Sequence, residues 1–321
     1  MKTPVIAIVC PCYNEEETLQ TSASRLDALL REMEDSALVA PGSLVLFVDD
    51  GSRDDTWPII ESLVSSGKRF AGLKLQRNAG QQNALMAGME AVRDLADCVV
   101  TIDVDLQDDI RVIPEMVRKY TDGADVVLGV RRDRSSDSWL KRTTAQGFYR
   151  LLKGLGMKTV YNHADFRLLS RRALNQLLSF PERNLYLRGM VTSVGHRREY
   201  VYYDRLPRTA GETKYTLSKM FNLAADGITS FSIRPVRMVF SLGCIFLLVA
   251  LGILVYVLVS YFTGNSTEGW SSIMLSIWFC SGVLLVALGI VGEYIGKIYS
   301  EVKQRPRFFV DTLLLPESKE K

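Results

Sequence analysis

Alternating apolar and polar stretches divide the first 130 residues into predicted strands and helices. Short β-rich apolar runs recur, and longer stretches with helical periodicity separate them. The pattern predicts strands over 5–10, 44–49, 72–76, 98–103 and 126–130, and helices over about 16–34, 55–65, 81–96 and 113–120. The strands are almost continuously apolar, which is typical of strands buried on both faces. We therefore expect an α/β fold with a mostly parallel sheet and helices on both faces.

Two long uncharged stretches near the end of the chain predict a transmembrane hairpin. Neither residues 238–262 nor residues 270–292 contain a charged side chain. A helix of about 20 apolar residues crosses a hydrocarbon core of about 30 Å. Two buried helices of a soluble core are the alternative, but such helices rarely continue for more than twenty residues without a charge. We expect two spans joined by the short loop 263–269.

The charged residues around these spans predict their orientation. Both outer flanks are basic, whereas the only charge in the connecting loop is Glu268. The basic flanking residues are Arg234, Arg237, Lys297, Lys303, Arg305 and Arg307. By the positive-inside rule, both termini lie in the cytoplasm. The predicted location is a cell (inner) membrane, and the apolar run near the N-terminus is too short for a signal peptide.

Acidic and basic residues are concentrated in different segments of the chain. The 321 residues are 47% hydrophobic with a net charge of +3, which excludes a disordered chain and a small disulfide scaffold. Residues 1–130 hold 12 Lys and Arg against 22 Asp and Glu, whereas residues 131–219 hold 19 against 7. An acidic segment and a basic segment therefore precede the apolar one. The five scattered cysteines favour reduced structural thiols over a zinc site or disulfides.

Polar residues gather where three predicted strands end, at 11–15, 49–52 and 103–107. The carboxyl ends of parallel strands are where ligands bind in such sheets. Helix caps and ordinary turns are the simpler explanation of the first two clusters. Asp103 and Asp105 differ, because two carboxylates at the end of an apolar strand favour a divalent cation with oxygen ligands. Gln107 follows in alternation, and no glycine-rich dinucleotide or P-loop motif is present.

Together these motifs resemble family 2 glycosyltransferases with the A-type nucleotide-sugar fold. The similar residues are Pro11-x-Tyr-Asn-Glu15, Asp49-Asp-Gly-Ser52 and Asp103-x-Asp-x-Gln107. Asp165-Phe-Arg167, the stretch from Arg208 to Tyr215 and the tail after the hairpin extend the resemblance to the polyprenyl-phosphate subfamily, which includes bactoprenol glucosyltransferases and dolichol-phosphate mannose synthases. A Gln-x-x-Arg-Trp motif of processive synthases is not found, which favours transfer of a single sugar.

The resemblance implies roles for the matching positions. The nucleotide would be held by Pro11, Tyr13, Asn14, Glu15, Asp50 and Asp103. Mg²⁺ or Mn²⁺ would be bound by Asp103, Asp105 and Gln107. Phosphates would be bound by Arg131, Arg134, Arg208 and Lys214. The catalytic set would comprise Asp105, Asp165, Arg208 and Lys214, with Asp165 acting as a base or as an orienting group.

The basic segment suits an anionic acceptor at a membrane surface. Arginine and lysine bind phosphates by bidentate and point-charge contacts, although attraction to an anionic leaflet alone would explain many of them. Nucleic acid is a less suitable partner, because the segment is tethered to a membrane and opposes an acidic domain. The expected partners are a UDP-sugar, a polyprenyl phosphate such as undecaprenyl phosphate, the bilayer and further copies of the chain in a homo-oligomer.

These expectations divide the chain into four parts. They are a cytoplasmic catalytic domain over 1–214, an interfacial amphipathic helix over 215–237, the hairpin over 238–292, and a cytoplasmic juxtamembrane helix and tail over 293–321. Glucose is the expected sugar, with mannose, N-acetylglucosamine, galactose and aminoarabinose as alternatives. A non-catalytic membrane adaptor is the alternative from a different class. A dehalogenase-type phosphatase and a phospho-receiver domain fit the motifs less well.

Overall fold

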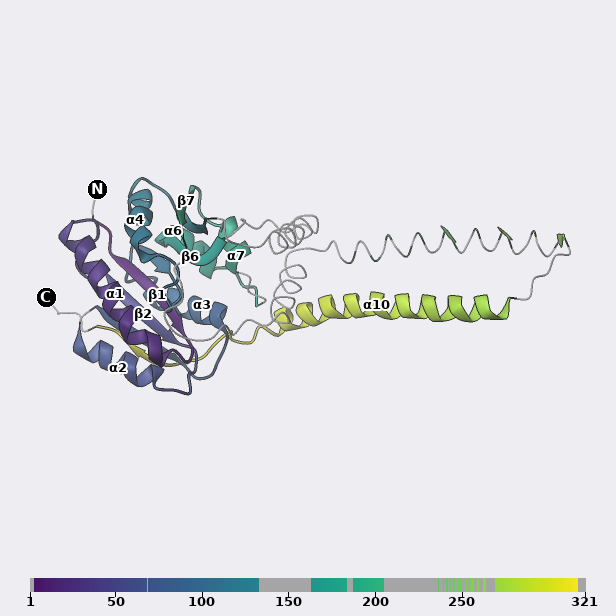
Figure 1. Cartoon of the computed structure of the whole chain (residues 1–321), viewed down its shortest axis with the longest axis horizontal. Helices are drawn as coiled ribbons and strands as arrows, with labels where there is room; N and C mark the ends of the chain where they lie inside the picture. The colour runs from purple at the N-terminus through teal and green to yellow at the C-terminus, as the bar shows by residue number, and fades with distance from the viewer. Residues whose placement is uncertain are drawn as a thin grey trace. The chain divides into compact units, whose positions relative to one another are not determined.

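The computed structural model describes residues 3–67, 69–132, 163–183, 187–204 and 269–316, and isolated positions between 236 and 263. Its described strands form one eight-stranded sheet in the order β7-β5-β6-β4-β1-β2-β3-β8 (Figure 1). The strands are β1 Ile6–Cys12, β2 Leu44–Asp49, β3 Phe70–Leu75, β4 Cys98–Thr101, β5 Val126–Arg131, β6 His163–Ser170, β7 Arg198–Tyr203 and β8 Val310–Leu314. Only β6 and β8 are antiparallel to their neighbours. The predicted mostly parallel α/β sheet is confirmed.

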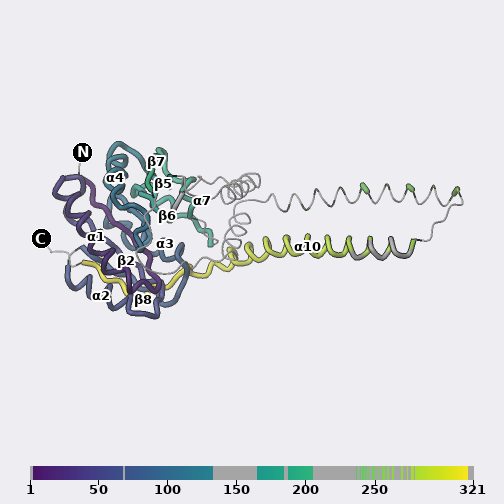
Figure 2. Tube along the Cα trace, in the orientation of Figure 1, coloured from purple at the N-terminus to yellow at the C-terminus, as the bar shows by residue number. Residues whose placement is uncertain are grey.

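Helices connect these strands and cover both faces of the sheet. Their bounds are α1 Glu16–Asp35, α2 Thr56–Ser66, α3 Gln81–Val92, α4 Ile113–Thr121, α6 Arg171–Leu178 and α7 Leu187–Met190, with short 3₁₀ turns η1 Ile110–Val112 and η2 Val191–Ser193. Figure 2 traces the chain through these elements and labels α1, α2, α3, α4 and α7. The four helices predicted from periodicity occur within a few residues of their expected ends. The exact end of each helix depends on turns and packing, which the periodicity of apolar residues does not define.

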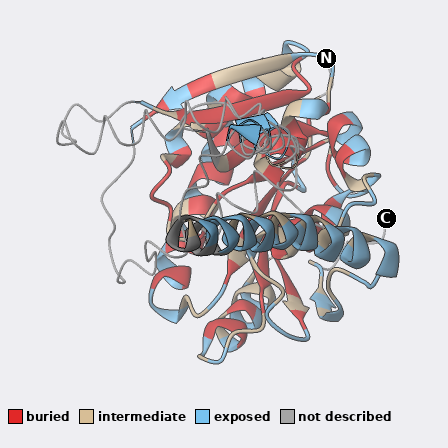
Figure 3. Ribbon diagram, turned by 90° about the vertical axis from the view of Figure 1, so that its right-hand side faces the viewer, coloured by how far each residue is buried: buried red, intermediate tan, exposed pale blue. Residues whose placement is uncertain are grey.

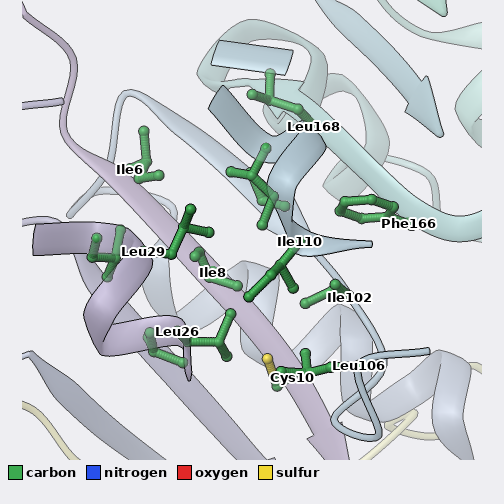
Figure 4. Close-up of a cluster of buried hydrophobic side chains, with 14 of the residues drawn as sticks. Ile6, Ile8, Cys10, Leu26, Leu29, Ile102, Leu106, Ile110, Phe166 and Leu168 are labelled. Carbon is green, nitrogen blue, oxygen red and sulfur yellow. The ribbon is translucent and has the colours of Figure 1, made fainter. Parts of the chain in front are cut away.

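Alternation along the strands gives the sheet two hydrophobic cores. Ile6, Ile8 and Cys10 of β1 face the core shared with α1, α2 and α4, and part of this core is drawn in Figure 4. Ala7 and Val9 face the other core, shared with α3, α6 and α7. Because successive side chains of a strand point to opposite faces, a strand that is apolar at every position serves both cores. This explains the continuous apolar runs of the sequence.

Helix α3 lies unusually close to the sheet, at Gly88. A Cβ at this position would stand 2.5 Å from Cγ1 of Val9 and 2.7 Å from Cγ2 of Val48. Only a residue without a side chain fits between α3 and strands β1 and β2. The close contact positions the N-terminal end of α3 firmly against the sheet.

The last strand of the sheet comes from the tail. The sequence predicts a juxtamembrane helix and tail over 293–321. In the structure Val310–Leu314 of this tail pairs antiparallel with β3, and the Gln76 amide donates to the Phe309 carbonyl at 3.0 Å. Phe308 packs against the core that contains α3. The C-terminal segment is thus part of the α/β domain, a pairing between distant segments that periodicity does not reveal.

A second compact unit contains the long helix α10, Trp270–Lys303. Among the residues that the structure describes, one helical stretch, Phe279–Lys303, is long and apolar enough to cross a membrane. Its apolar side chains are exposed, among them Leu284, Leu285 and Val286. Figure 3 colours much of this helix as exposed. The predicted second span and the juxtamembrane helix are one continuous helix. The interfacial helix lies almost wholly outside the described residues. The first predicted span is described only at scattered positions between 239 and 262, and these positions are helical.

Candidate active site

The turn after β4 holds the two carboxylates predicted to bind a metal. Strand β4 ends at Thr101, two residues earlier than predicted, and the Leu106 amide donates to the Asp103 carbonyl at 3.1 Å. Leu106 has a φ of 44°, in the left-handed region. Residues 103–107 therefore form a tight turn, and the strand alternation expected for Gln107 is wrong. Gln107 is buried, and its backbone amide donates to Asp105 Oδ1 at 3.3 Å.

Asp103 lies in a cluster of acidic side chains. Its pKa is raised to about 7, first because the carboxyl group is removed from solvent and then because of the charges of Asp165, Asp108 and Asp105. The guanidinium group of Arg131 opposes this rise. The cluster is thus short of positive charge, which a cation among the carboxylates would supply.

Strand β6 brings Asp165 to this cluster. Thr101, the last residue of β4, pairs with Arg167 of the antiparallel strand β6, so Asp165 lies beside the turn that follows β4. The charge of Asp165 acts on Asp103 in that turn. The Thr101 hydroxyl also donates to the Asp165 carbonyl at 2.6 Å. Because β6 runs antiparallel, its beginning lies at the edge where β4 ends. Two predicted site residues more than sixty positions apart therefore meet.

Two arginines hold the Asp165 carboxylate. Arg167, which is fully buried, donates through Nη2 to Oδ1 at 2.5 Å, and Arg188 donates through Nη2 to Oδ2 at 3.0 Å. Arg188 keeps 40% of its side chain exposed. A carboxylate between two guanidinium groups is better suited to orienting them than to removing a proton. Arg188 was not predicted, because it lies in an arginine-rich segment without a motif.

Arg131 is placed beside the acidic cluster, as its predicted phosphate-binding role requires, but it already has a partner. It donates through Nε to Asp108 Oδ1 at 3.1 Å, and Asp108 is almost fully buried. The Arg131 side chain as a whole remains 30% exposed. Arg134, Arg208 and Lys214 lie outside the described residues.

Hydrogen bonds in both directions connect the loop after β1 with the loop after β2. The Asn14 amide donates to Ser52 Oγ at 3.0 Å, and the Arg53 amide donates to Asn14 Oδ1 at 2.9 Å. The Glu15 amide donates to Thr56 Oγ1 at 2.9 Å. Asn14 takes a left-handed φ of 52°, a conformation that asparagine tolerates well. Asn14 and Glu15 thus shape the predicted nucleotide site through their backbone and side chains.

Pro11 and Tyr13 are the other nucleotide-site residues from this part of the chain. Pro11 lies within β1, opposite Val48 of β2, and Tyr13 follows the strand with 38% of its surface exposed. An exposed aromatic ring beside a fixed loop is available to stack on a planar base. Their predicted roles stay predictions.

Asp50 connects the second cluster to α3. Its Oδ1 accepts from the Ala79 amide at 2.7 Å and its Oδ2 from the Gly80 amide at 2.9 Å. Burial raises the pKa of Asp50, whereas these two amide bonds lower it. Gly51, with a φ of 69°, is needed beside it because a Cβ would stand 2.6 Å from the Asn78 amide nitrogen. In this structure Asp50 therefore positions the segment that leads into α3.

The donor chemistry of the site fits a hard divalent cation. Asp103 and Asp105 offer carboxylate oxygens, which Mg²⁺ and Mn²⁺ prefer. Within the part of the chain that the structure describes, no group of three His, Cys, Asp or Glu side chains is arranged to hold a metal ion. Two carboxylates leave most of a coordination sphere for other oxygen ligands. Buried Cys10 and Cys98 have raised thiol pKa values through burial and are unsuited to metal binding.

Comparison with known proteins places these features in a family. Residues 7–178 match the model described as glycosyl transferase family 2. The chain is 46% identical over 314 residues to the uncharacterized glycosyltransferase YkoT of Bacillus subtilis, covering 98% of this chain and 93% of that protein. It is 39% identical over 310 residues to the prophage bactoprenol glucosyl transferase homolog of Escherichia coli, covering 95% and 98%.

A solved structure of glucosyl-3-phosphoglycerate synthase from Mycobacterium tuberculosis is also similar. That protein was crystallised with Mn²⁺, UDP-glucose and phosphoglyceric acid. The identity is 20%, covering 70% of this chain and 78% of that chain, with a TM-score of 0.44.

Proposed function

The chain belongs to glycosyl transferase family 2 and is a glycosyltransferase, and on that basis we propose that it transfers one glucose from UDP-glucose to the phosphate of a polyprenyl phosphate. The acceptor class is suggested by relatives named bactoprenol glucosyl transferase, which match this chain over nearly its full length. The observation that carries the chemistry is the meeting of the acidic turn after β4 with Asp165 and its two arginines.

The donor would lie at the carboxyl edge of the sheet. Its nucleoside would contact the fastened loops at Tyr13 and Glu15, and its diphosphate would face Asp103 and Asp105. A divalent cation held by these two carboxylates would neutralise the diphosphate and stabilise it as it departs. Mg²⁺ and Mn²⁺ both suit the oxygen ligands, and Gln107 is a further proposed ligand.

The acceptor would approach from the side of Asp165. A phosphate monoester has a second pKa near 6, so its oxygen is already largely anionic at pH 7 and needs little deprotonation. This oxygen would attack the anomeric carbon and form the new C–O bond. The bond to the diphosphate oxygen would break, UDP would leave with the electron pair, and the configuration would invert. Asp165 would orient Arg188 toward the acceptor phosphate.

The reaction would take place at the cytoplasmic face of a cell membrane. The exposed apolar surface of α10 is the support for membrane attachment. Two spans, cytoplasmic termini and a homo-oligomer complete the proposal. Arg134, Arg208 and Lys214 are proposed to bind phosphates near the membrane surface.

Substitution of Asp105 tests the assignment. We expect Asp105→Asn to lower turnover with UDP-glucose, Mn²⁺ and undecaprenyl phosphate by at least about a hundredfold, because the cation loses a charged ligand. Asp109→Asn is the matched control, since Asp109 caps η1 and pairs with Arg111 instead of joining the acidic cluster. Full activity of Asp105→Asn would refute the proposal.

Two further measurements separate the alternatives. A membrane adaptor would bind neither UDP nor Mn²⁺, whereas a glycosyltransferase should bind UDP more tightly when Mn²⁺ is present, which calorimetric titration would show. Mass spectrometry of the lipid product after incubation with a panel of nucleotide sugars would distinguish glucose from mannose, N-acetylglucosamine, galactose and aminoarabinose.

A further inference from the structure

Two adjacent glutamines at the start of α3 contact the two halves of the site. Gln81 donates through Nε2 to Asp103 Oδ1 at 2.7 Å. Gln82 accepts through Oε1 from the Leu187 amide at 2.8 Å. The partners dictate both amide orientations, because a carboxylate only accepts and a backbone N–H only donates.

Leu187 is held at both of its backbone polar groups. Its amide donates to Gln82, and its carbonyl accepts from Nη1 of the buried Arg167 at 3.3 Å. The next residue, Arg188, donates to Asp165. The start of α7 is therefore fixed by one side chain from α3 and one from β6. Loss of the Gln82 bond would free the backbone that carries Arg188.

The base from which the two glutamines project is itself rigid. Asp50 accepts from the Ala79 and Gly80 amides immediately before them, and Gly88 allows α3 to pack directly on β1 and β2. A side chain on a fixed helix can hold a partner in one orientation at a small entropic cost. Asp50 thus also determines where Gln81 and Gln82 lie.

We propose that Gln81 and Gln82 are positioning residues, Gln81 for the metal-binding carboxylate Asp103 and Gln82, through Leu187, for the acceptor-side Arg188. The division of labour rests on the proposed function, in which Asp103 faces the donor and Arg188 the acceptor phosphate. The two neighbouring side chains thereby fix the position of Asp103, on the donor side, relative to Arg188, on the acceptor side.

Methionine substitutions separate the two roles, because methionine keeps length and apolar volume but offers no comparable hydrogen bond. Gln81→Met should weaken Mn²⁺ binding in the presence of UDP by about tenfold, the usual scale for a lost hydrogen bond to a metal ligand, and leave the KM for undecaprenyl phosphate unchanged. Gln82→Met should raise that KM about fivefold to tenfold, the value of one hydrogen bond, and leave Mn²⁺ binding unchanged.

Two further variants serve as controls. Gln82→Glu keeps an oxygen that can accept from the Leu187 amide, so its acceptor KM should stay within about twofold of the wild type. Gln176→Met removes an equivalent bond, from Gln176 Oε1 to the Gly195 amide, outside the site and should change neither constant. Hydrogen exchange at the Leu187 amide should accelerate in Gln82→Met and not in Gln82→Glu.

The outcomes distinguish this proposal from the proposed function. Unchanged Mn²⁺ affinity in Gln81→Met, or unchanged Leu187 exchange or acceptor KM in Gln82→Met, would overturn the positioning roles. An equal change of both constants in each variant would do the same. If the wild-type enzyme transferred sugar to no lipid phosphate, the proposed function would fail, whereas the Mn²⁺ and exchange measurements would still decide whether the glutamines hold their partners.

Discussion

The pKa of Asp103 is set by the burial of its carboxyl group and by the charges around it. Asp103 stands among Asp105, Asp108 and Asp165, and burial together with these charges raises its pKa to about 7. A carboxyl group that holds its proton near neutral pH is in a site where its ionised form is unfavourable unless a positive charge is close to it. The energetic cost of the cluster in the metal-free protein is the physical reason for expecting a cation there.

The raised pKa predicts a pH-dependent metal affinity. Above pH 7 Asp103 is ionised and ready to bind, whereas below pH 7 a cation must displace its proton. Mn²⁺ affinity measured by calorimetry with UDP present should therefore fall about tenfold from pH 8 to pH 6, with release of about one proton at the lower pH. Affinity that stays constant over this range would contradict the charge clustering.

Asp125 shows the opposite behaviour and a structural role. Its carboxylate accepts from Ser170 Oγ, from the Arg172 side chain and from the backbone amides of His196 and Arg197. Despite the opposing effect of burial, these bonds lower its pKa to about 2. Asp125 thereby joins the start of β5 to α6 and to the loop before β7.

A lowered pKa in the folded state means that the ionised form stabilises the fold. This contribution is present above the ordinary pKa of aspartate near 4 and is lost as the pH falls from 4 toward 2. Asp125→Asn should lower the free energy of unfolding at pH 7 by about 2 kcal/mol, and by less at pH 3. Denaturant unfolding in detergent measures both values, with the exposed Asp122→Asn as a control that should change neither.

Among the elements, α3 packs closely on the sheet at Gly88. Its apolar face would have predicted burial, but the distance of approach depends on Gly88 and on the valines that it meets. No sequence pattern shows which glycine of a helix lies against a strand, because that contact is made between residues separated by about forty and eighty positions along the chain.

Substitution of Gly88 tests this contact. Gly88→Ala should lower the free energy of unfolding by about 2 kcal/mol, since the new methyl group overlaps the side chains of Val9 and Val48. The cost should be smaller in a Val48→Ala background, which removes one of the two overlaps and leaves the one with Val9. Equal costs in the two backgrounds, measured by denaturant unfolding, would show that α3 does not pack as closely as described.

At the scale of the whole molecule, the tail completes the α/β domain. β8 pairs with β3 and makes that strand an internal one. Uncovered edge strands present free backbone groups and favour aggregation. A segment that follows the long apolar helix in the sequence therefore contributes to the stability of the domain formed by the first two hundred residues.

Truncation measures this contribution. Removal of residues 305–321 should lower the melting temperature of the α/β domain by at least about 5 °C and promote aggregation, because β3 becomes an edge strand. Removal of residues 317–321 alone keeps β8 and should leave the melting temperature unchanged. Identical melting curves for the two truncated proteins would argue against a stabilising role of β8.

The sequence by itself determined the class of fold, the ends of most early strands and helices, the long apolar stretches and the three polar clusters after β1, β2 and β4. These features are local: periodicity reflects burial, and carboxylates beyond apolar strands stand out wherever the chain later places them. The resemblance carried by the same clusters named the family, which the comparisons confirm.

Only the tertiary structure decided which distant residues meet. The antiparallel register of β6 brings Asp165 to the turn that contains Asp103, and long-range hydrogen bonds bring Gln82 to Leu187 and β8 to β3. Strand order, direction and register result from the packing of the entire sheet, and residues adjacent in the sequence do not determine them. Arg188, Gln81 and Gln82 therefore join the candidate site only once the chain is folded.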